Sequence, residues 1–335
     1  MATSSRTGTL ALQMDLFGYD PMAAKAEGPE LTVLCYGCGQ DSTTLLYRYA
    51  LDPEFRRKYA PNRFLVLMAE TGDEHQGTYD HLAFTKEFCK QHGIEFVHIV
   101  PEMGYHAPNW QSLRGFYRAM GCCGSKAFPK TCTDRLKLQP IYKFLEDWLE
   151  GQYSVTAGKK KGYVNFARRY GRIRMIVGIA KGEDRRIADA TQETQLWKCH
   201  SIEMSYPLVE LGLDRAGCQA YMKEVDLPRP PPSNCILCPF LSEIELLYLY
   251  RFLRDDYLDW VDIEATKLAK NAHMNAVVVT DKKGRTKTVN KNYGVWGEKT
   301  LPQKMEEVLA KYGRMSDDEL HEYKMSHGHC VASVY

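Results

Sequence analysis

The sequence has no long hydrophobic run and no large excess of charge of either sign. No segment approaches the roughly 20 consecutive apolar residues that a membrane-spanning helix needs, which argues against membrane contact. Lys and Arg total 44 against 42 Asp and Glu, so the whole chain has no general attraction to nucleic acid or lipid. The first 30 residues contain no apolar core of a targeting signal, and no internal repeat is visible. We therefore expect a cytoplasmic protein.

Cysteine is the abundant residue in this otherwise ordinary composition. The chain has eleven cysteines among 335 residues, an odd number in a protein large enough to fold without disulfides. Such usage favours thiol or metal chemistry in a reducing compartment over a framework of disulfides.

The hydrophobic pattern predicts strands and helices in alternation. Short, apolar, partly β-branched runs over 31–36, 64–69 and 95–100 predict buried strands, and helical spacing fills 44–50 and 79–92 between them. Strands that alternate with helices form parallel sheets with crossover helices. We therefore predict an α/β fold with a doubly wound, Rossmann-like parallel sheet.

The same pattern divides the chain into parts. We expect a flexible segment over 1–28, a nucleotide-binding α/β domain over 29–212 with a basic insertion at 151–174, and a mainly helical, cysteine-bearing region over 213–335. The last region contains a predicted β-hairpin around Gly284.

A glycine-rich loop follows the first predicted strand and opens the first helix. Its residues, with the tyrosine before them, are Tyr36, Gly37, Cys38, Gly39, Gln40, Asp41, Ser42 and Thr43. Glycines let the backbone approach a ligand, and the N–H groups of a helix N-terminus attract phosphate. The spacing fits neither the Walker A loop nor the Rossmann fingerprint. The alternative interpretation is a plain turn in which Asp41 or Ser42 caps the helix.

This loop resembles the PP-loop of ATP pyrophosphatases, written SGGxDS, with Gly37 in place of Ser and Cys38 in place of Gly. The segment Ala69–Glu74, with Glu70, Thr71 and Gly72, is similar to the "DTGxE" element of PAPS reductase-like proteins. Further elements that resemble this group are the run from Cys132 to Ile141, the run from Gly178 to Arg186, and Tyr206–Glu210.

The resemblance implies an adenine nucleotide alpha hydrolase-like fold and the reaction of that family. The loop would hold the leaving pyrophosphate of ATP with Mg²⁺ while the α-phosphorus is attacked, with Glu70, Thr71 and Gly72 beside the nucleotide. The implied catalytic residues are Asp41, Arg135, Lys137 and Arg186. Within the group, the sequence is most similar to the DndC and SspD proteins of DNA phosphorothioation.

Cysteines in the second half of the chain suggest a metal site. Cys235 and Cys238 are separated by two residues, a spacing that lets both thiolates bind one metal. With Cys218 and Cys132 they make four candidate ligands, which suit a [4Fe–4S] cluster or Zn²⁺. The alternative for Cys218 is a buried apolar role. Cys122 and Cys123 are adjacent and are candidate sulfur carriers.

The basic insertion is the candidate contact with nucleic acid. Its cations are Lys159, Lys160, Lys161, Arg168, Arg169 and Arg172. Cations mixed with Tyr163, Phe166 and Tyr170 suit a phosphodiester backbone, with the aromatic rings available for stacking. The alternative interpretation is a solvated loop.

Together these features predict an ATP pyrophosphatase that adenylates a substrate oxygen for sulfur transfer. By resemblance the substrate would be the DNA backbone, with a cysteine desulfurase as the sulfur donor and other DNA-modification proteins as partners. A tRNA thiolation enzyme and a PAPS reductase-like enzyme are alternatives. A non-catalytic, zinc-stabilised nucleic-acid-binding protein is the alternative of a different class.

Overall fold

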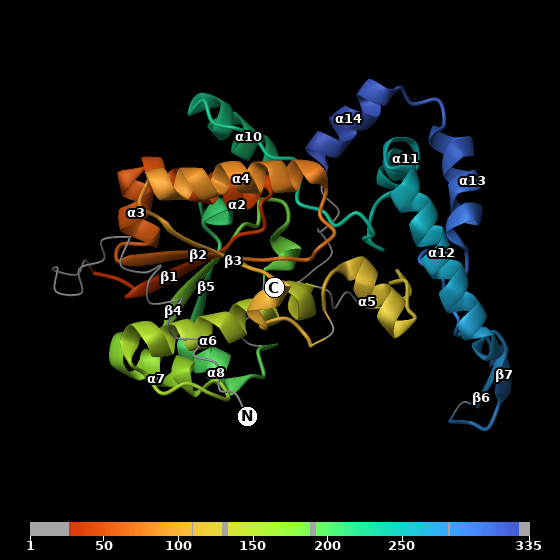
Figure 1. Cartoon of the computed structure of the whole chain (residues 1–335), viewed down its shortest axis with the longest axis horizontal. Coiled ribbons are helices and arrows are strands. Elements are labelled where there is room, and N and C mark those ends of the chain that lie inside the picture. Colours follow the sequence, from red (N-terminus) through yellow and green to blue (C-terminus); the bar gives the residue numbers. More distant parts are fainter. Residues whose placement is uncertain (1–26, 109, 129–132, 188–191, 281, 328–335) are drawn as a thin grey trace.

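The computed structural model describes residues 27–108, 110–128, 133–187, 192–280 and 282–327. Within them lies a five-stranded parallel sheet of order β3-β2-β1-β4-β5 (Figure 1). Its strands are β1 (Leu31–Cys35), β2 (Arg63–Ala69), β3 (Glu95–Ile99), β4 (Ile173–Val177) and β5 (Ile202–Ser205). The predicted α/β fold with a doubly wound parallel sheet is confirmed.

Helices cover both faces of the sheet (Figure 1). One face carries α2 (Gln40–Leu51), α3 (Pro53–Tyr59), α4 (Gln76–Gln91) and α10 (Arg215–Glu224), and the other carries α6 (Gln139–Tyr153), α7 (Lys161–Tyr170) and α8 (Leu196–Ser201). The short helix α9 (Pro207–Glu210) follows β5. A π-helical turn over Thr133–Leu138 leads into α6.

The sheet is buried on both faces because apolar side chains alternate along its strands. Leu65 and Leu67 of β2 point to the cluster that includes α6, while Val66 and Met68 point to the cluster that includes α2 and α4. Side chains of a strand alternate with period two, so a continuous apolar run serves both layers.

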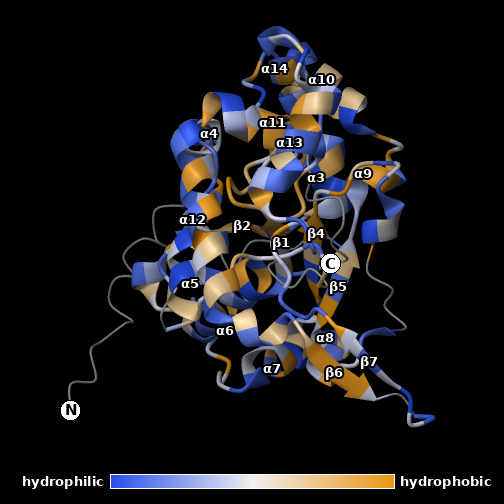
Figure 2. Ribbon diagram, turned by 90° about the vertical axis from the view of Figure 1, so that its right-hand side faces the viewer, coloured by the Kyte–Doolittle hydropathy of each residue, from blue (hydrophilic) through white to orange (hydrophobic). Residues whose placement is uncertain are grey.

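A third hydrophobic cluster lies outside the sheet. It joins α5 (Leu113–Met120) to the C-terminal helices α11 (Glu243–Phe252), α12 (Arg254–Lys270), α13 (Leu301–Tyr312) and α14 (Asp317–Ser326). The hairpin of β6 (Val277–Thr280) and β7 (Thr286–Val289) extends from α12 away from the sheet (Figures 1 and 2). This hairpin is the one predicted around Gly284.

Several elements were not predicted from the sequence. The edge strand β5 was not predicted because Glu203 interrupts its apolar run. Helix α7 lies inside the basic insertion, for which no helix was predicted. Helix α5 lies in a stretch for which the sequence pattern gave no element. None of the helices in the described part of the chain is long and apolar enough to cross a membrane.

Strand β4 ends against the first turn of α2, and this contact has no room for a side chain. A Cβ on Gly178 would lie 2.7 Å from the backbone nitrogen of Ser42 and 3.0 Å from the carbonyl carbon of Asp41. Both neighbours are backbone atoms and cannot rotate away. Glycine at this position therefore sets the distance between β4 and the N-terminus of α2.

We expect Gly178→Ala to lower the free energy of unfolding by about 1–3 kcal/mol, the usual range for overpacking. The matched control is Gly151→Ala in α6, where an added Cβ meets nothing within 4 Å and should raise stability slightly. Urea denaturation measures both. Equal effects of the two substitutions would contradict the tight contact.

Candidate functional site

The loop between β1 and α2 lies at the carboxyl edge of the sheet, where the strand order reverses. Strand β1 has β2 on one side and β4 on the other. Ligands of doubly wound sheets bind at this switch point. The N-cap of α2, Gly39, makes no side-chain capping hydrogen bond, so no cap competes with a ligand for the first N–H groups of α2.

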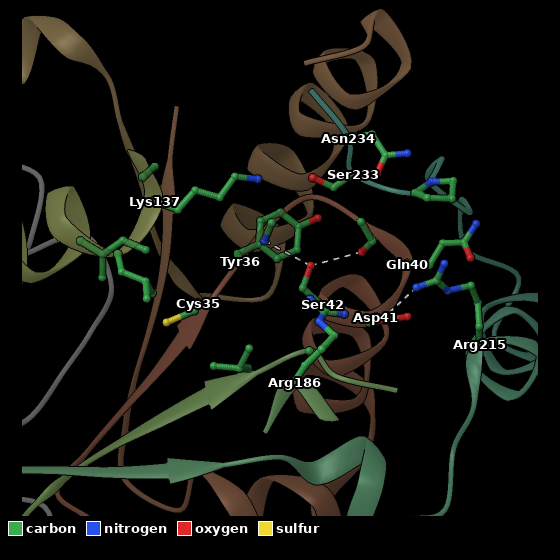
Figure 3. A pocket seen from close by; sticks show the side chains of 18 residues that line it. Cys35, Tyr36, Gln40, Asp41, Ser42, Lys137, Arg186, Arg215, Ser233 and Asn234 are labelled. Atoms are coloured by element: carbon green, nitrogen blue, oxygen red, sulfur yellow. Dashed lines mark hydrogen bonds and ion pairs between the residues drawn. The ribbon is translucent and has the colours of Figure 1, made fainter. Parts of the chain in front are cut away.

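A cleft of about 860 Å³, counted to its open mouth, lies over this edge (Figure 3). Its polar lining includes Gln40, Asp41, Ser42, Lys137, Arg186, Arg215, Ser233 and Asn234. Its apolar lining includes Ala69, Leu138, Ile141 and Val177. One part of the wall is polar while another is apolar, which is the kind of lining found in small-molecule sites.

The two departures from the PP-loop pattern leave the cleft open. Cys38 has φ = 56°, in the left-handed region that favours glycine, but its buried side chain turns to the core, where Sγ donates to the carbonyl oxygen of Thr78 at 3.3 Å. Burial raises the pKa of this thiol to about 12. A Cβ at Gly37 would lie 3.9 Å from Oγ of Ser233, which is buried and has no hydrogen-bond partner among the described residues. Ser233 therefore places its hydroxyl near the position that the hydroxyl of a serine at residue 37 would occupy.

The loop is closed by Ser42, and Asp41 faces the cleft beside it. Oγ of Ser42 donates to the carbonyl oxygen of Gly39 at 3.2 Å and accepts from the N–H of Gly37 at 3.3 Å (Figure 3). Oδ2 of Asp41 lies 3.6 Å from the Arg215 guanidinium, while Oδ1 is buried without a partner in the described structure. Burial raises the pKa of Asp41 despite Arg215. A desolvated carboxylate oxygen of this kind is a good ligand for Mg²⁺.

Two arginines flank the loop, and one glutamate holds both. Glu183 forms ion pairs with Nη1 of Arg186 and, at 2.8 Å, with Nη2 of Arg215. The sequence singled out Arg186 but missed Arg215 and Glu183. A cation at the start of α10, where the helix dipole is unfavourable to it, is a signal that could have found Arg215.

Three of the predicted loop residues form hydrogen bonds to the surrounding protein. The hydroxyl of Tyr36 is hydrogen-bonded to Oγ1 of Thr43 at 3.0 Å and to Oγ1 of Thr85 at 2.9 Å. The side chains of Tyr36 and Thr43 are thus engaged in the core. Gln40 is also tied, because its amide donates to the carbonyl oxygens of Pro230 and Met325 at 3.1 and 2.9 Å.

The segment after β2 lies beside the cleft and does not line it. Burial raises the pKa of Glu70, but hydrogen bonds from His98, the N–H of Gly72 and Tyr79 outweigh burial and lower the pKa to about 2. At Gly72, φ is +77°, and a Cβ would lie 2.6 Å from Cβ of Ser112. Glu70 and Gly72 therefore shape the turn that follows β2.

Thr71 and Glu74 connect this turn to Lys137 and Cys235. Oε1 of Glu74 accepts from Oγ1 of Thr71 at 3.0 Å and from Nζ of Lys137 at 3.2 Å. Sγ of Cys235 lies 3.6 Å from the same oxygen and 3.7 Å from Oγ1 of Thr71. A cation that lines the cleft and a half-buried thiol thus share one buried carboxylate.

Arg135 does not accompany Lys137 into the cleft. It is exposed on the π-helical turn and lines a second cleft on the other side of the start of α6. The residues of this turn point in different directions, so Arg135 and Lys137 face different clefts. Arg135, which the resemblance implied to be catalytic, therefore does not line the cleft that contains Lys137 and Arg186.

The predicted metal ligands are not assembled by the described residues. Cys218 packs with α2 in the core of one sheet face, where burial raises its pKa to about 12. Cys235 and Cys238 lie on the segment before α11, and Cys132 lies outside the described residues. In the described ranges there is no group of three or more His, Cys, Asp or Glu side chains that could hold a metal. Cys218 thus has the buried apolar role.

Cys122 and Cys123 follow α5 in an anchored turn. The carbonyl oxygen of Cys123 accepts from the indole N–H of Trp260 at 3.1 Å. Burial raises the pKa of both thiols, that of Cys123 to about 12. Both line the second cleft, but neither is activated as a thiolate in this structure.

The basic insertion is only partly available to a partner. Lys160 donates to the carbonyl oxygen of Tyr142 at 3.1 Å, lies 3.5 Å from Glu146, and has a pKa lowered by burial. Tyr163 and Phe166 are fully buried, so they cannot stack on bases as predicted. The remaining cations, Lys159, Lys161, Arg168, Arg169 and Arg172, are exposed. Arg172 directly precedes β4, at the edge of the sheet opposite to the cleft.

Comparisons with known proteins give a distant likeness in structure only. A scan against protein-family models and a search of curated proteins find no match. Among solved structures, the chain is similar to the U34-tRNA thiolase NcsA from Methanococcus maripaludis with its [4Fe-4S] cluster, at 13% sequence identity and a TM-score of 0.37. The alignment covers 92% of this chain and 82% of that chain. A likeness this weak carries no argument, so the function has to be argued from the site.

The thiols give the first test of the site. We expect metal bound by anaerobically purified protein to be lost in the double variant Cys235→Ser, Cys238→Ser, because these cysteines share one turn and one of them faces Glu74. Cys218→Ala is the control and should keep its metal, because Cys218 packs in the core. Elemental analysis and the visible absorption spectrum report the result. Loss of metal in Cys218→Ala, with metal kept in the double variant, would contradict the assignment of Cys235 and Cys238 as ligands.

Proposed function

We propose that the protein binds ATP with Mg²⁺ in the cleft beside β1 and β4 and cleaves it to AMP and pyrophosphate. The observation that carries this proposal is the buried Asp41 carboxylate, with Oδ1 unpartnered in the described structure, between an N-terminal helix turn and Arg215. A bare phosphate would be repelled by this carboxylate. A phosphate chain that brings a divalent cation satisfies both the carboxylate and the arginines.

The distribution of the lining suggests how ATP lies. The loop, Asp41, Arg186 and Arg215 would take the β- and γ-phosphates, and the apolar wall of Leu138 and Ile141 would take the adenine ring. Figure 3 shows Cys35 and Lys137 on the opposite side of the cleft from Arg215. Lys137 would then lie nearer to the α-phosphate than the loop arginines do.

The chemistry we propose has two steps. An oxygen of the second substrate attacks the α-phosphorus, and pyrophosphate leaves toward the loop, where the N–H groups of α2 and the two arginines stabilise its charge. In the second step, the terminal sulfur of a cysteine persulfide, supplied by a cysteine desulfurase, attacks the adenylated atom and displaces AMP, so that substrate and protein are joined by a disulfide. A second cysteine thiolate then attacks the protein sulfur of this disulfide, which releases the thiolated substrate and leaves a protein disulfide for a cellular thiol to reduce.

For the substrate, we propose the phosphate backbone of DNA, with other DNA-modification proteins as partners. The support is the sequence resemblance to DndC and SspD together with the exposed cations of 159–172. A [4Fe–4S] cluster or Zn²⁺ would be held by Cys235 and Cys238 with Cys132, and would supply sulfur binding or structural support. No step of the proposed reaction passes through this group.

Thiolation of a tRNA base is the second candidate function, and the aromatic lining of the second cleft favours it. It would use the same loop and thiols, because a base carbonyl oxygen can be adenylated as a phosphate oxygen can. The two functions differ in substrate. A DNA-modifying enzyme should turn over ATP with duplex DNA, whereas a thiolase should require structured RNA.

We expect Asp41→Asn to slow pyrophosphate release by roughly 100-fold or more, because the metal ligand is lost while the shape is kept. The assay measures pyrophosphate from ATP with a DNA or RNA substrate and a sulfur donor. Because burial raises the pKa of Asp41, the wild-type rate should fall on acidification at a higher pH than an ordinary Asp would cause. Asp80→Asn, on the exposed side of α4, is the control. An undiminished rate in Asp41→Asn would refute the assignment.

Ser233 provides a test by rescue. We expect Ser233→Ala to weaken ATP binding roughly fivefold, the usual effect of one lost hydrogen bond. Adding Gly37→Ser should restore the affinity, because a Cβ at position 37 has ordinary contact distance to Ser233. Calorimetric titration with ATP and Mg²⁺ measures all three proteins. If the double variant binds ATP no better than Ser233→Ala alone, the hydroxyl at position 37 does not replace that of Ser233.

A further inference from the structure

A second cleft, of about 1440 Å³ counted to its mouth, lies between α5, the start of α6 and the C-terminal helices. Its lining is rich in aromatic rings, among them Trp110, Phe116, Phe128, Phe240 and Tyr293. Trp110 and Phe116 have ring centroids 5.1 Å apart, and Phe128 meets Tyr293 at 5.8 Å. Phe128 is 54% exposed at the rim, so its ring offers a free face. An aromatic lining with one exposed ring face favours a flat ligand.

The charges of this cleft are all of one sign. Arg135, Lys143 and Lys267 line it, and no Asp or Glu is among its described lining residues. Arg135 and Lys143 are exposed, whereas Lys267 donates to the carbonyl oxygen of Tyr293 at 2.6 Å. Because aromatic faces and exposed cations occur together without an acid, the expected ligand has both a flat ring and a negative charge.

One buried donor also awaits a partner. Trp110 is only 3% exposed, and its indole Nε1 has no hydrogen-bond acceptor among the described residues. A buried N–H without a partner costs free energy that a ligand can recover. A carbonyl oxygen or ring nitrogen of a base is an acceptor of the right kind.

We propose that the second cleft binds one unstacked base of a nucleic-acid strand, with the flanking phosphates on Arg135 and Lys143. The enclosed part of the cleft, about 490 Å³, lies within the range of about 300–1,000 Å³ of small-ligand pockets and has room for a single base. The inference rests on the proposed function in one respect: the bound base belongs to the nucleic acid that the proposed reaction modifies.

The two clefts share their walls, and the thiols lie between them. Ser233 and Asn234 line the nucleotide cleft, and Pro239 and Phe240, a few residues further on, line the second one. Cys235 and Cys238 belong to the segment that connects these pairs. The start of α6 is shared in the same way, because Lys137 faces one cleft and Arg135 the other. A base in the second cleft would therefore lie across the thiol segment from ATP.

The test is binding of fluorescein-labelled single-stranded 12-mers by the full chain without ATP, measured by fluorescence anisotropy. We expect DNA or RNA 12-mers to bind more tightly than an abasic 12-mer of the same charge. Phe128→Ala should weaken binding of the base-containing strand roughly 5- to 100-fold, the usual effect of losing one stacking ring, and leave the abasic strand unchanged. Phe128 is exposed, so this variant should fold. Trp110→Phe removes the N–H donor together with part of the ring and should act in the same direction.

Leu196→Ala is the control, because Leu196 is 73% exposed on α8 and is not a lining residue of the second cleft. Tighter binding of DNA or of RNA identifies the strand that supplies the base. Equal affinity for base-containing and abasic strands, or an unchanged affinity in Phe128→Ala, overturns the inference. The binding assay contains no ATP, so it is independent of the proposed ATP cleavage. If base binding is observed but Asp41→Asn leaves pyrophosphate release unchanged, the proposed function is refuted and the base site is not.

Discussion

The close backbone contact between β4 and the first turn of α2 is the constraint on which the cleft over the β1–α2 loop depends. Gly178 lets the strand end within van der Waals distance of Ser42 and Asp41. The chain beyond β4 is tied to the start of α10, because the N–H of Lys181 donates to the carbonyl oxygen of Leu213 at 2.8 Å. This places Glu183, Arg186 and Arg215 around the loop. A wider gap at Gly178 would move the arginines away from Asp41.

Charge in the cleft is balanced before any ligand arrives. Asp41 and Glu183 offset Arg186 and Arg215, so none of these buried or half-buried groups is left uncompensated. Buried charges are costly unless they are paired, and removal of one partner costs more than the pair contributes. Glu183 is therefore a positioning residue that keeps both guanidinium groups at the loop. In the proposed complex, the phosphates would contact the arginines and the divalent cation would contact Asp41.

The sequence was sufficient for the fold class and for the position of the glycine-rich loop between β1 and α2, and insufficient for side-chain direction. Short apolar runs predicted β1, β2 and β3 because strands buried on both faces have that pattern. The roles of Tyr163, Phe166 and Lys160 were mispredicted because a basic segment does not reveal which of its residues face the core. Arg135 and Lys137 are two positions apart on a helical turn, so they face different sides and line different clefts.

The position of Ser233 could not be predicted, since its contact with Gly37 spans almost 200 residues of sequence. The same holds for Cys235 and Glu74, which the isolated bridge between their backbones brings together. Spacing can suggest that cysteines share a ligand, but it cannot show that Cys218 packs under α2 while Cys235 faces the turn after β2. Sites assembled from several segments need the three-dimensional arrangement.

The central claim is that the β1–α2 loop holds the phosphates of ATP and that Asp41 holds the metal. A crystal structure with α,β-methylene-ATP and Mn²⁺ tests it most directly, because the anomalous signal locates the metal independently of the nucleotide. The account predicts the terminal phosphates at the N–H groups that begin α2, with Mn²⁺ bound to Oδ1 of Asp41. A nucleotide bound elsewhere, or a metal that does not contact Asp41, would contradict it.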